Sequence, residues 1–341
     1  MRLTTMKAEE AAKNALECVL EAAPSERILI TCDDEKAEIG QAFANGALAL
    51  GLWTRLLMLK TDKIRKEIPP ELTEIIVTTK PDICINIMRG IGEETVFRIK
   101  TIVLQTRNKK TRLGHCPGVT IDMLTNGALA LTTEEHRNMQ NFATQLMTQL
   151  SNTEKVEITN PAGTKLILST ENRPFFTDTK LDWKDLKWMN LPTGEVLVGP
   201  VEDSLNGKLV CDTAIGGIPK PLKTPLEITA KNGKAISITS KDKTTLGKVK
   251  QWLNTDNWSN MIGEFAIGIN PKARLVNEFV ESEKIFGTIH IAFGHNLDFP
   301  GGKNPSKNHL DLLISKPTVK ITKKNRETRT ILQDGKFKTE K

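Results

Sequence analysis

The sequence predicts two domains: an α/β N-terminal domain, in which helices flank a parallel sheet, and a β-rich α+β C-terminal domain. At 341 residues the chain is longer than one hydrophobic core of ordinary size can serve. Helix and strand signals alternate in its first third, whereas strands joined by turns predominate from about residue 155 onward. We therefore expect the first domain to span residues 1–154 and the second to span residues 155–341.

The parallel sheet is predicted by strands that alternate with helices of about ten to fifteen residues, the pattern of βαβ units. Each helical segment carries apolar residues at helical spacing, and each strand segment is a short apolar run. The helices are expected over residues 7–24, 38–51 and 69–79, and the strands over residues 27–34, 54–60 and 81–88.

Parallel sheets of this kind often bind nucleotides at a glycine-rich turn, and the nearest match is RGIGEET at residues 89–95. Gly90 and Gly92 are not followed by the third glycine of the dinucleotide fingerprint. Two glutamates stand where a phosphate group would bind. The segment therefore does not predict a nucleotide site.

A long helix is predicted over residues 132–150. Thr132 and Glu135 form a capping box at its start, and an apolar stripe begins at Met139. His136 lies one turn before this stripe, so we expect it at the edge of the helix.

Strands dominate the remainder of the chain. Residues 156–170 predict a hairpin that turns at NPAG, and residues 225–240 predict a second hairpin that turns at Asn232–Gly233. The tail over residues 318–337 has the same character, and one helix, over residues 243–254, interrupts the strands.

Composition argues against nucleic-acid and membrane partners. The net charge is +7, but residues 320–341 alone hold eight Lys or Arg against three Asp or Glu, so the excess is mostly a feature of the tail. Aromatic residues are few, with no tyrosine for base stacking, and no apolar run is long enough for a membrane span. The first twenty residues are acidic where a signal peptide is apolar, and the five cysteines are scattered, which predicts a cytoplasmic protein with reduced thiols.

Three of the five histidines fall within residues 287–317. Period-two alternation in the strand TIHIAF places His290 opposite its two isoleucine neighbours. In HLDLLI, His309 and Asp311 share the face opposite two leucines. Imidazoles and a carboxylate held side by side on strands suit a metal ion, and two histidines with one carboxylate serve both non-haem iron oxygenases and zinc hydrolases.

Two glutamates extend this set. Glu195 opens an apolar strand after Pro-Thr-Gly, and Glu264 follows a glycine in MIGEFAIGIN. A carboxylate at the start of an apolar strand is costly to bury unless it is paired or binds a cation. Five candidate ligands exceed the needs of one tetrahedral zinc and suit two bridged ions; they are Glu195, Glu264, His290, His309 and Asp311.

In this order, the segments NLPTGEVLVGPVEDSLNG, GEFAIGIN, GTIHIAFG and NHLDLLI resemble the metallo-aminopeptidases of the aminopeptidase T and aminopeptidase S group. The resemblance covers residues 180–320 well and the N-terminal domain loosely. By this resemblance, the five candidate ligands match the metal ligands of the family. It also implies a two-domain homodimer that removes N-terminal amino acids from peptides.

The mechanism that the resemblance implies uses two divalent ions (zinc, cobalt or manganese). They activate a bridging water, polarise the first peptide carbonyl and anchor the free α-amine of a small peptide substrate. Glu195 and Glu264 are candidates to carry the proton to the leaving amine. A carboxylate that is committed to a metal ion is a poor base, so that role stays open.

One departure from the family leaves an alternative. The family has a tyrosine a few residues after its first metal-binding histidine, whereas the corresponding loop here reads GHNLDFPGG, with His295 as a candidate for that role. The same fold family includes iron-dependent dioxygenases that open dihydroxypyridine rings, which this chain resembles in His290, His309 and Asp311. In that alternative one Fe(II) ion binds a small catecholic molecule and dioxygen, and His115 acts as the base.

Overall fold

A computed structural model describes residues 5–108, 110–182 and 187–338. The chain folds into two compact units. Unit 1 lies within Met1–Asn141, Asp178–Thr193 and Pro271–Arg274, and unit 2 within Phe142–Thr177, Gly194–Asn270 and Leu275–Lys341. The chain therefore passes between the units at several points. The sequence had suggested a single boundary, between residues 154 and 155.

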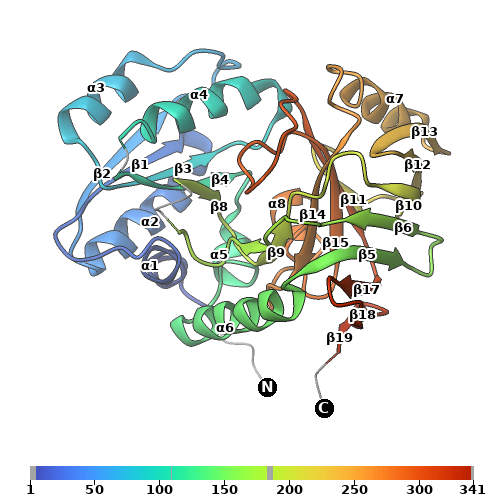
Figure 1. Cartoon of the computed structure of the whole chain (residues 1–341). Helices are drawn as coiled ribbons and strands as arrows, with labels where there is room; N and C mark the ends of the chain where they lie inside the picture. Colours follow the sequence, from blue (N-terminus) through green and yellow to red (C-terminus); the bar gives the residue numbers. More distant parts are fainter. Residues whose placement is uncertain (1–4, 109, 183–186, 339–341) are drawn as a thin grey trace. The chain divides into compact units, whose positions relative to one another are not determined.

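Unit 1 is built on a five-stranded parallel sheet with the strand order β2-β1-β3-β4-β8. Helices α1 and α2 cover one face of this sheet, and α3 and α4 cover the other (Figure 1). The parallel sheet with flanking helices that the sequence predicts is thus confirmed. The strands are β1 (Arg27–Asp33), β2 (Trp53–Leu59), β3 (Ile83–Met88), β4 (Arg112–Pro117) and β8 (Trp188–Asn190), and the helices are α1 (Ala8–Cys18), α2 (Ala37–Ala49), α3 (Pro70–Thr79), α4 (Thr95–Gln105) and α5 (Ile121–Thr125). Helix α6 (Thr133–Leu150) begins in unit 1 and continues into unit 2.

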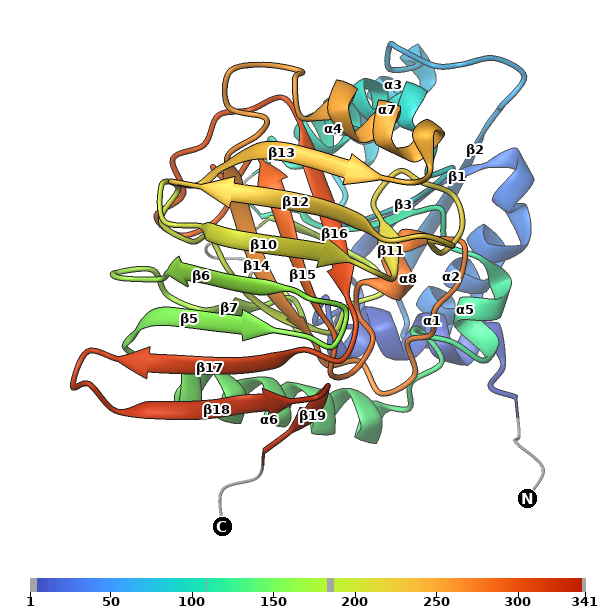
Figure 2. The same ribbon diagram turned by 90° about the vertical axis from the view of Figure 1, so that its right-hand side faces the viewer.

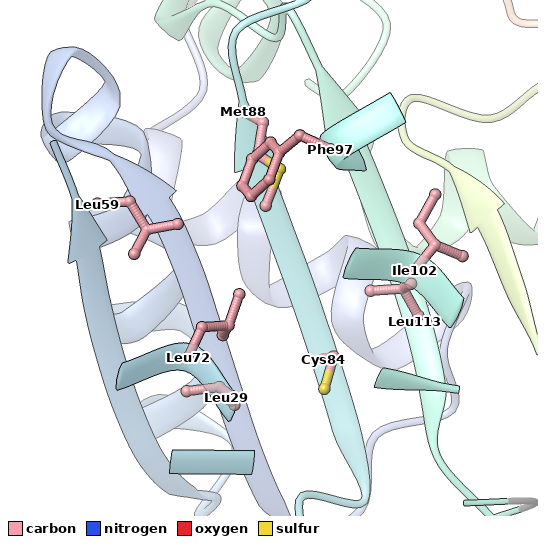
Figure 3. Packing of buried hydrophobic residues seen from close by; sticks show 8 residues of the cluster. All are labelled: Leu29, Leu59, Leu72, Cys84, Met88, Phe97, Ile102 and Leu113. Carbon is pink, nitrogen blue, oxygen red and sulfur yellow. The ribbon is translucent and has the colours of Figure 1, made fainter. Parts of the chain in front are cut away.

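A compact apolar cluster joins the sheet of unit 1 to helices α3 and α4 (Figure 3). Its eight side chains come from strands and helices that are distant in sequence, and all are at most 7% exposed. Burial of this apolar surface is the main favourable contribution to the stability of the unit. The cluster consists of Leu29, Leu59, Leu72, Cys84, Met88, Phe97, Ile102 and Leu113.

The glycine-containing segment after β3 leads into a 3-10 turn, Gly92–Glu94, at the start of α4. Glu94 is fully buried, and its carboxylate forms ion pairs of 2.6 Å with Arg65 and with Arg89. The acidic group at this turn therefore serves the packing of the unit.

Helix α6 begins with the expected capping box. The backbone N–H of Thr132 donates to Glu135 Oε2 at 2.7 Å, and the backbone N–H of Glu135 donates to Thr132 Oγ1 at 3.1 Å. His136, expected at the helix edge, is instead buried, with 1% of its surface exposed. That expectation was wrong because His136 lies three residues before Met139 and so continues the buried stripe by one turn.

Among the described residues, unit 2 contains two antiparallel sheets, the C-terminal part of α6 and two shorter helices. Figure 2 shows the eight-stranded sheet spread across the strands of the six-stranded sheet. The first sheet has the order β13-β12-β10-β6-β5-β17-β18-β19 and the second the order β11-β16-β15-β14-β9-β7. The expected β-rich C-terminal part is thus confirmed.

The eight-stranded sheet comprises β5 (Thr153–Thr159), β6 (Lys165–Ser169), β10 (Asn206–Cys211), β12 (Leu226–Lys231), β13 (Lys234–Ser240), β17 (Thr318–Lys323), β18 (Thr328–Gln333) and β19 (Lys336–Phe337). The six-stranded sheet comprises β7 (Phe176–Thr177), β9 (Glu195–Val198), β11 (Ala214–Ile215), β14 (Ile262–Gly268), β15 (Ile289–Gly294) and β16 (His309–Ile314). The helices are α7 (Lys243–Trp252) and α8 (Phe279–Ser282).

Both predicted hairpins form. Strands β5 and β6 pair across the NPAG turn, and β12 pairs with β13 across Asn232–Gly233, where both residues adopt positive φ. Among the described residues, no helix has the length and hydropathy that a membrane span requires.

The burial of His136 predicts an acid-sensitive unit 1. Neither ring nitrogen has a hydrogen-bond partner among the described residues, and burial lowers the pKa of His136 to about 4. Between pH 6.5 and 4 the unfolded chain binds a proton that the folded chain does not, so stability falls as the pH falls through this window. We expect urea unfolding to show this contribution, of about 3 kcal/mol, in the wild type but not in His136→Leu.

Arg137→Leu is the matched control, because it removes an exposed charge from the same helix without removing a group that titrates in this window. Its free energy of unfolding should follow the pH dependence of the wild type. Parallel curves for the wild type and His136→Leu between pH 4 and 6.5 would contradict the prediction.

Candidate metal centre

The strand register brings four candidate ligands to one face of the six-stranded sheet. Directly paired residues of antiparallel strands share a face, as do alternate residues of one strand. Glu264 on β14 pairs with Ala292 on β15, which pairs with Asp311 on β16. His290 lies two residues before Ala292, and His309 lies two residues before Asp311, so both imidazoles join the same face.

Glu195 reaches this face from β9. It pairs with Gly268, which lies four residues after Glu264 on β14 and therefore faces the same way. The preceding Gly194 has φ of 134°, and a Cβ atom there would lie 2.5 Å from Asn270 Cβ. Only glycine allows this approach, which places Glu195 at the first position of β9. We call the face that carries Glu195, Glu264, His290, His309 and Asp311 the site face.

A β-bulge sets the direction of Glu264. Ile262 pairs with Phe293 and Glu264 pairs with Ala292, so Gly263 is an extra residue on β14. A Cβ atom at Gly263 would lie 2.4 Å from the carbonyl oxygen of Gly294, so glycine is required for the two strands to approach. The bulge lets Ile262 point to the apolar face while Glu264, two residues later, points to the site face.

The carboxylate of Glu264 lies between the two histidines. Its Oε1 atom is 3.2 Å from His290 Nε2, and its Oε2 atom is 3.1 Å from His309 Nε2. Asp311 Oδ1 is 3.1 Å from His309 Nε2 and 3.9 Å from His290 Nε2. Glu195 Oε2 is 3.7 Å from His290 Nε2. All five candidate ligands therefore meet in one cluster.

The hydrogen bonding of His309 fits a bound cation. Its Nδ1 atom is 2.8 Å from the backbone carbonyl oxygen of His295, which can only accept, so Nδ1 carries the hydrogen. In the neutral ring Nε2 is then an acceptor, yet it faces carboxylate oxygens of Glu264 and Asp311. Three acceptors converge only around a proton or a cation, and a carbonyl that fixes the tautomer is typical of metal-binding histidines.

Without an ion, these contacts shift the pKa values strongly. Burial lowers the pKa of His290, but the carboxylates of Glu264, Glu195 and Asp311 outweigh it and raise the pKa to about 9. The same opposition leaves the pKa of His309 well above its usual range. Burial raises the pKa of Glu264, whereas hydrogen bonds from the two imidazoles lower it below its usual range. Without an ion, the protonated imidazoles of His290 and His309 therefore provide the positive charge that a bound metal ion would otherwise provide.

Two charged residues that the sequence reasoning missed lie against this cluster. Glu283 is 8% exposed and offers a carboxylate oxygen within 4.8 Å of ligand atoms of His290 and Asp311. Lys284 is 1% exposed, and its Nζ atom contacts Glu195 Oε1. The sequence signal was a Glu-Lys pair just before an apolar strand. Strand alternation could not place the pair, because the turn at Gly287 separates it from β15.

His115 lies in unit 1, within β4, and is 4% exposed. Burial, together with the nearby Arg98 charge, lowers the pKa of His115 to about 3, so its ring is neutral at physiological pH. Its role as a catalytic base stays a prediction.

The loop between β15 and β16 is held by buried side chains. Asn296 Nδ2 donates to Glu202 Oε1 and to the carbonyl oxygen of Gly263, each at 3.2 Å. Asn296 Oδ1 accepts the backbone N–H of Asn304 at 2.8 Å. His295, the candidate for the role of the family tyrosine, is half-buried, with its Nε2 atom 3.9 Å from Asp298.

Comparison with known proteins identifies the family. Residues 130–337 match the sequence profile of the M29 peptidases, described as thermophilic metalloproteases. The chain belongs to this family. The match spans every residue of the site face, and the resemblance noted in the sequence is thereby confirmed. No curated protein sequence matches the chain significantly.

Two solved structures share the fold over nearly their whole lengths. Wild-type AmpT from Thermus thermophilus is 16% identical, with a TM-score of 0.70; the match covers 97% of this chain and 98% of AmpT. A 2,5-dihydroxypyridine dioxygenase from Pseudomonas putida KT2440 is 15% identical, also with a TM-score of 0.70; that match covers 98% of this chain and 97% of the dioxygenase. As a member of a metalloprotease family, the chain is a hydrolase that uses a divalent metal.

Removal of divalent metal is expected to destabilise the protein. The buried carboxylates of the site face repel one another without an ion, and a ligand that binds only the folded state stabilises it by about 4 kcal/mol at a thousand times its Kd. We expect a chelator to lower the thermal midpoint, and added zinc, cobalt or manganese to restore it, as measured by differential scanning calorimetry.

The control is His290→Ala, which lacks one of the imidazoles between the carboxylates. Its thermal midpoint should respond less to chelator and to added ions than that of the wild type. An identical midpoint for the wild type with and without chelator would contradict a metal centre on the site face.

Proposed function

We propose that this protein is an aminopeptidase whose two divalent ions bind on the site face, to Glu195, Glu264, His290, His309 and Asp311. The observation that carries the proposal is the position of Glu264, whose two carboxylate oxygens face different imidazoles. A carboxylate placed in this way can bridge two ions. Zinc, cobalt and manganese suit this set of nitrogen and oxygen ligands.

The donor atoms form three overlapping groups, and the third, Glu283 with His290 and Asp311, includes a residue outside the five proposed ligands. The five proposed ligands make up the other two groups: Glu195, Glu264 and His290, and Glu264, His309 and Asp311. Within each group the ligand atoms lie within 4.8 Å of one another, as they must to reach a common ion. Because Glu264 belongs to both of these groups and its two oxygens face different imidazoles, it would be the ligand shared by the two ions.

The charge of the site supports bound divalent metal. When ionised, the carboxylates of Glu195, Glu264 and Asp311 carry three negative charges, and the Lys284 ammonium group beside Glu195 carries one positive charge. Divalent ions would compensate this excess, and buried charge is stable only when it is compensated in this way.

When bound, the ions activate a water molecule and polarise the carbonyl of the first peptide bond. The residues of the chain orient these partners. The hydrogen bond from His309 Nδ1 to the His295 carbonyl fixes the ring, so that Nε2 keeps its direction. Glu195 and Glu264 serve as ligands in this proposal and are for that reason poor proton carriers.

The ring-cleaving dioxygenase is not favoured as the function. The family match is to metalloproteases, and the likeness to the Pseudomonas putida dioxygenase, at 15% identity, concerns the fold. A single iron at His290, His309 and Asp311 would leave the buried carboxylates of Glu195 and Glu264 outside its ligand set. For an aminopeptidase, the expected substrate is a small peptide with a free α-amine. We also propose that the protein acts as a cytoplasmic homodimer.

The proposal is tested by metal content and by substrate choice together. Protein purified without chelators and without air should contain close to two zinc, cobalt or manganese ions per chain by mass spectrometry. It should release the chromophore from aminoacyl p-nitroanilides. N-acetylated aminoacyl p-nitroanilides are the matched control and should not be cleaved, because acetylation removes the free amine.

Close to one iron per chain, with oxygen consumption on dihydroxylated aromatic compounds, would contradict the aminopeptidase and support the dioxygenase. Equal cleavage of free and acetylated substrates would contradict an aminopeptidase while leaving a hydrolase.

Substitution of Glu264 or of Glu195 should have different effects on the binding of the two ions. Glu264→Gln removes charge from both donor groups, so we expect it to reduce bound metal at both positions. Activity should fall by about a hundred-fold or more, because the ions contribute several kcal/mol to the reaction. Glu195→Gln should weaken only the ion beside His290 and retain close to one ion per chain. Equal metal loss in the two variants, measured after dialysis, would contradict the bridging role of Glu264.

A further inference from the structure

Lys284 is a buried lysine at the edge of the site face. Its side chain is 2% exposed, and its Nζ atom contacts Glu195 Oε1 and lies 3.1 Å from Glu283 Oε1. Burial of a lysine is costly unless its charge is compensated, and these two carboxylates compensate it. The ammonium group therefore lies among the carboxylates of the proposed metal centre.

The backbone fixes Lys284 in this place. Its carbonyl oxygen accepts the N–H of Asn270 at 2.9 Å, and the next residue, Ile285, forms a bridge with Asn270. A Cβ atom at Gly268 would lie 2.2 Å from the carbonyl oxygen of Ile285, so the close approach requires glycine. Gly268 is also the residue that pairs with Glu195. Lys284 and Glu195 are thus held on opposite sides of the same strand end.

The two oxygens of Glu195 have different neighbours. Oε1 contacts the ammonium group of Lys284, whereas Oε2 lies 3.7 Å from His290 Nε2. A carboxylate rotates freely unless one of its oxygens is bound. The contact with Lys284 directs the second oxygen to the donor group that Glu195 shares with His290.

We propose that Lys284 is a positioning residue of the metal centre, which binds one oxygen of Glu195 and so directs the other to the ion beside His290. The inference rests on the proposed function, since it requires the two ions of that centre. Lys284 acts through Glu195 and does not itself bind metal. Its positive charge also reduces the repulsion among the carboxylates before the ions bind.

Outer residues that orient a metal ligand typically change metal affinity by about 10–100-fold. The expected effect of Lys284 is confined to one of the two ions. Lys284 forms ion pairs with Glu195 and Glu283, so its effect is expected at the ion that Glu195 would hold, and the affinity of the ion at Glu264, His309 and Asp311 should not change. This difference separates a positioning role from a general role in folding, which would affect both ions alike.

The experiment is a titration of the metal-free full-length chain with Co²⁺, followed by the visible absorption of the bound ion. The wild type should bind two ions. Lys284→Met, which keeps an unbranched apolar stem, should bind one of them about 10–100-fold more weakly and the other unchanged. Lys284→Arg, which keeps the charge, should restore part of the lost affinity. Lys208→Met is the matched control, because Lys208 forms an exposed ion pair of 2.7 Å with Glu227 in the same unit.

A second measurement tests whether Lys284 acts through Glu195. In the Glu195→Gln background, Lys284→Met should cause no further loss of Co²⁺ affinity, because the oriented carboxylate is already absent. If Lys284→Met does not fold, as judged by circular dichroism, Lys284→Gln replaces it, since glutamine keeps a hydrogen-bond donor without the charge.

Unchanged affinity for both ions in the Lys284 variants would overturn the inference, as would a full further loss in the Glu195→Gln background. Equal weakening of both ions would overturn it too, in favour of a general role in folding. A wild-type chain that binds fewer than two ions would instead contradict the proposed dinuclear centre, so failure of the inference and failure of the proposed function give different results.

Discussion

The crowding of carboxylates on one buried sheet face is the constraint on which the rest of unit 2 depends. Two like charges about 4 Å apart repel by roughly 4 kcal/mol at the effective dielectric near a protein surface, and more at a buried site. Here Glu195, Glu264, Glu283 and Asp311 meet around His290, and the Lys284 ammonium group contacts Glu195 and lies 3.1 Å from Glu283. The raised pKa of His290 reflects this excess of negative charge, whereas the lowered pKa of Glu264 reflects the hydrogen bonds that the two imidazoles donate to it. A divalent ion compensates that excess, which is why metal binding and folding are coupled in such a site.

The sheet makes this crowding possible by keeping the space between the ligands empty of large side chains. On the central strands β14 and β15 the other positions of the site face are small, namely Ala266, Gly268, Ala292 and Gly294, and the leucines of this face, Leu197 and Leu313, lie on the flanking strands. The opposite face of the same strands carries isoleucine, leucine and phenylalanine, which supply the apolar burial that offsets the cost of the polar face. Ligand direction is thus set by strand register and by the bulge at Gly263, and the side chains have little freedom left to lose when an ion binds.

The features that could be predicted from the sequence are those that strand alternation determines. His290, His309 and Asp311 could be assigned to the polar faces of their strands, because successive side chains of a strand alternate between its faces. Glu195 and Glu264 could be identified because a carboxylate at the start of an apolar strand is costly to bury unless it is paired or binds a cation. Glu283 and Lys284 escaped because they precede the turn at Gly287, beyond which the alternation of β15 does not extend. The burial of His115 within β4 depends on tertiary packing that strand periodicity does not reveal. Gly114 permits this close packing, since a Cβ atom there would lie 2.8 Å from the Leu191 side chain, and Pro117 ends the strand.

The fold alone does not determine the chemistry of this chain. A 2,5-dihydroxypyridine dioxygenase and AmpT match it with the same TM-score of 0.70, so likeness of fold does not choose between chemistries. What distinguishes the possible functions is the number of buried negative charges around His290, His309 and Asp311. One ferrous ion needs few, whereas a pair of hydrolytic ions needs a bridging carboxylate and further oxygen donors. In the proposed function, Glu264 between the two imidazoles and Glu195 in contact with Lys284 would supply those donors, and each follows a glycine at which a Cβ atom would collide with its neighbours.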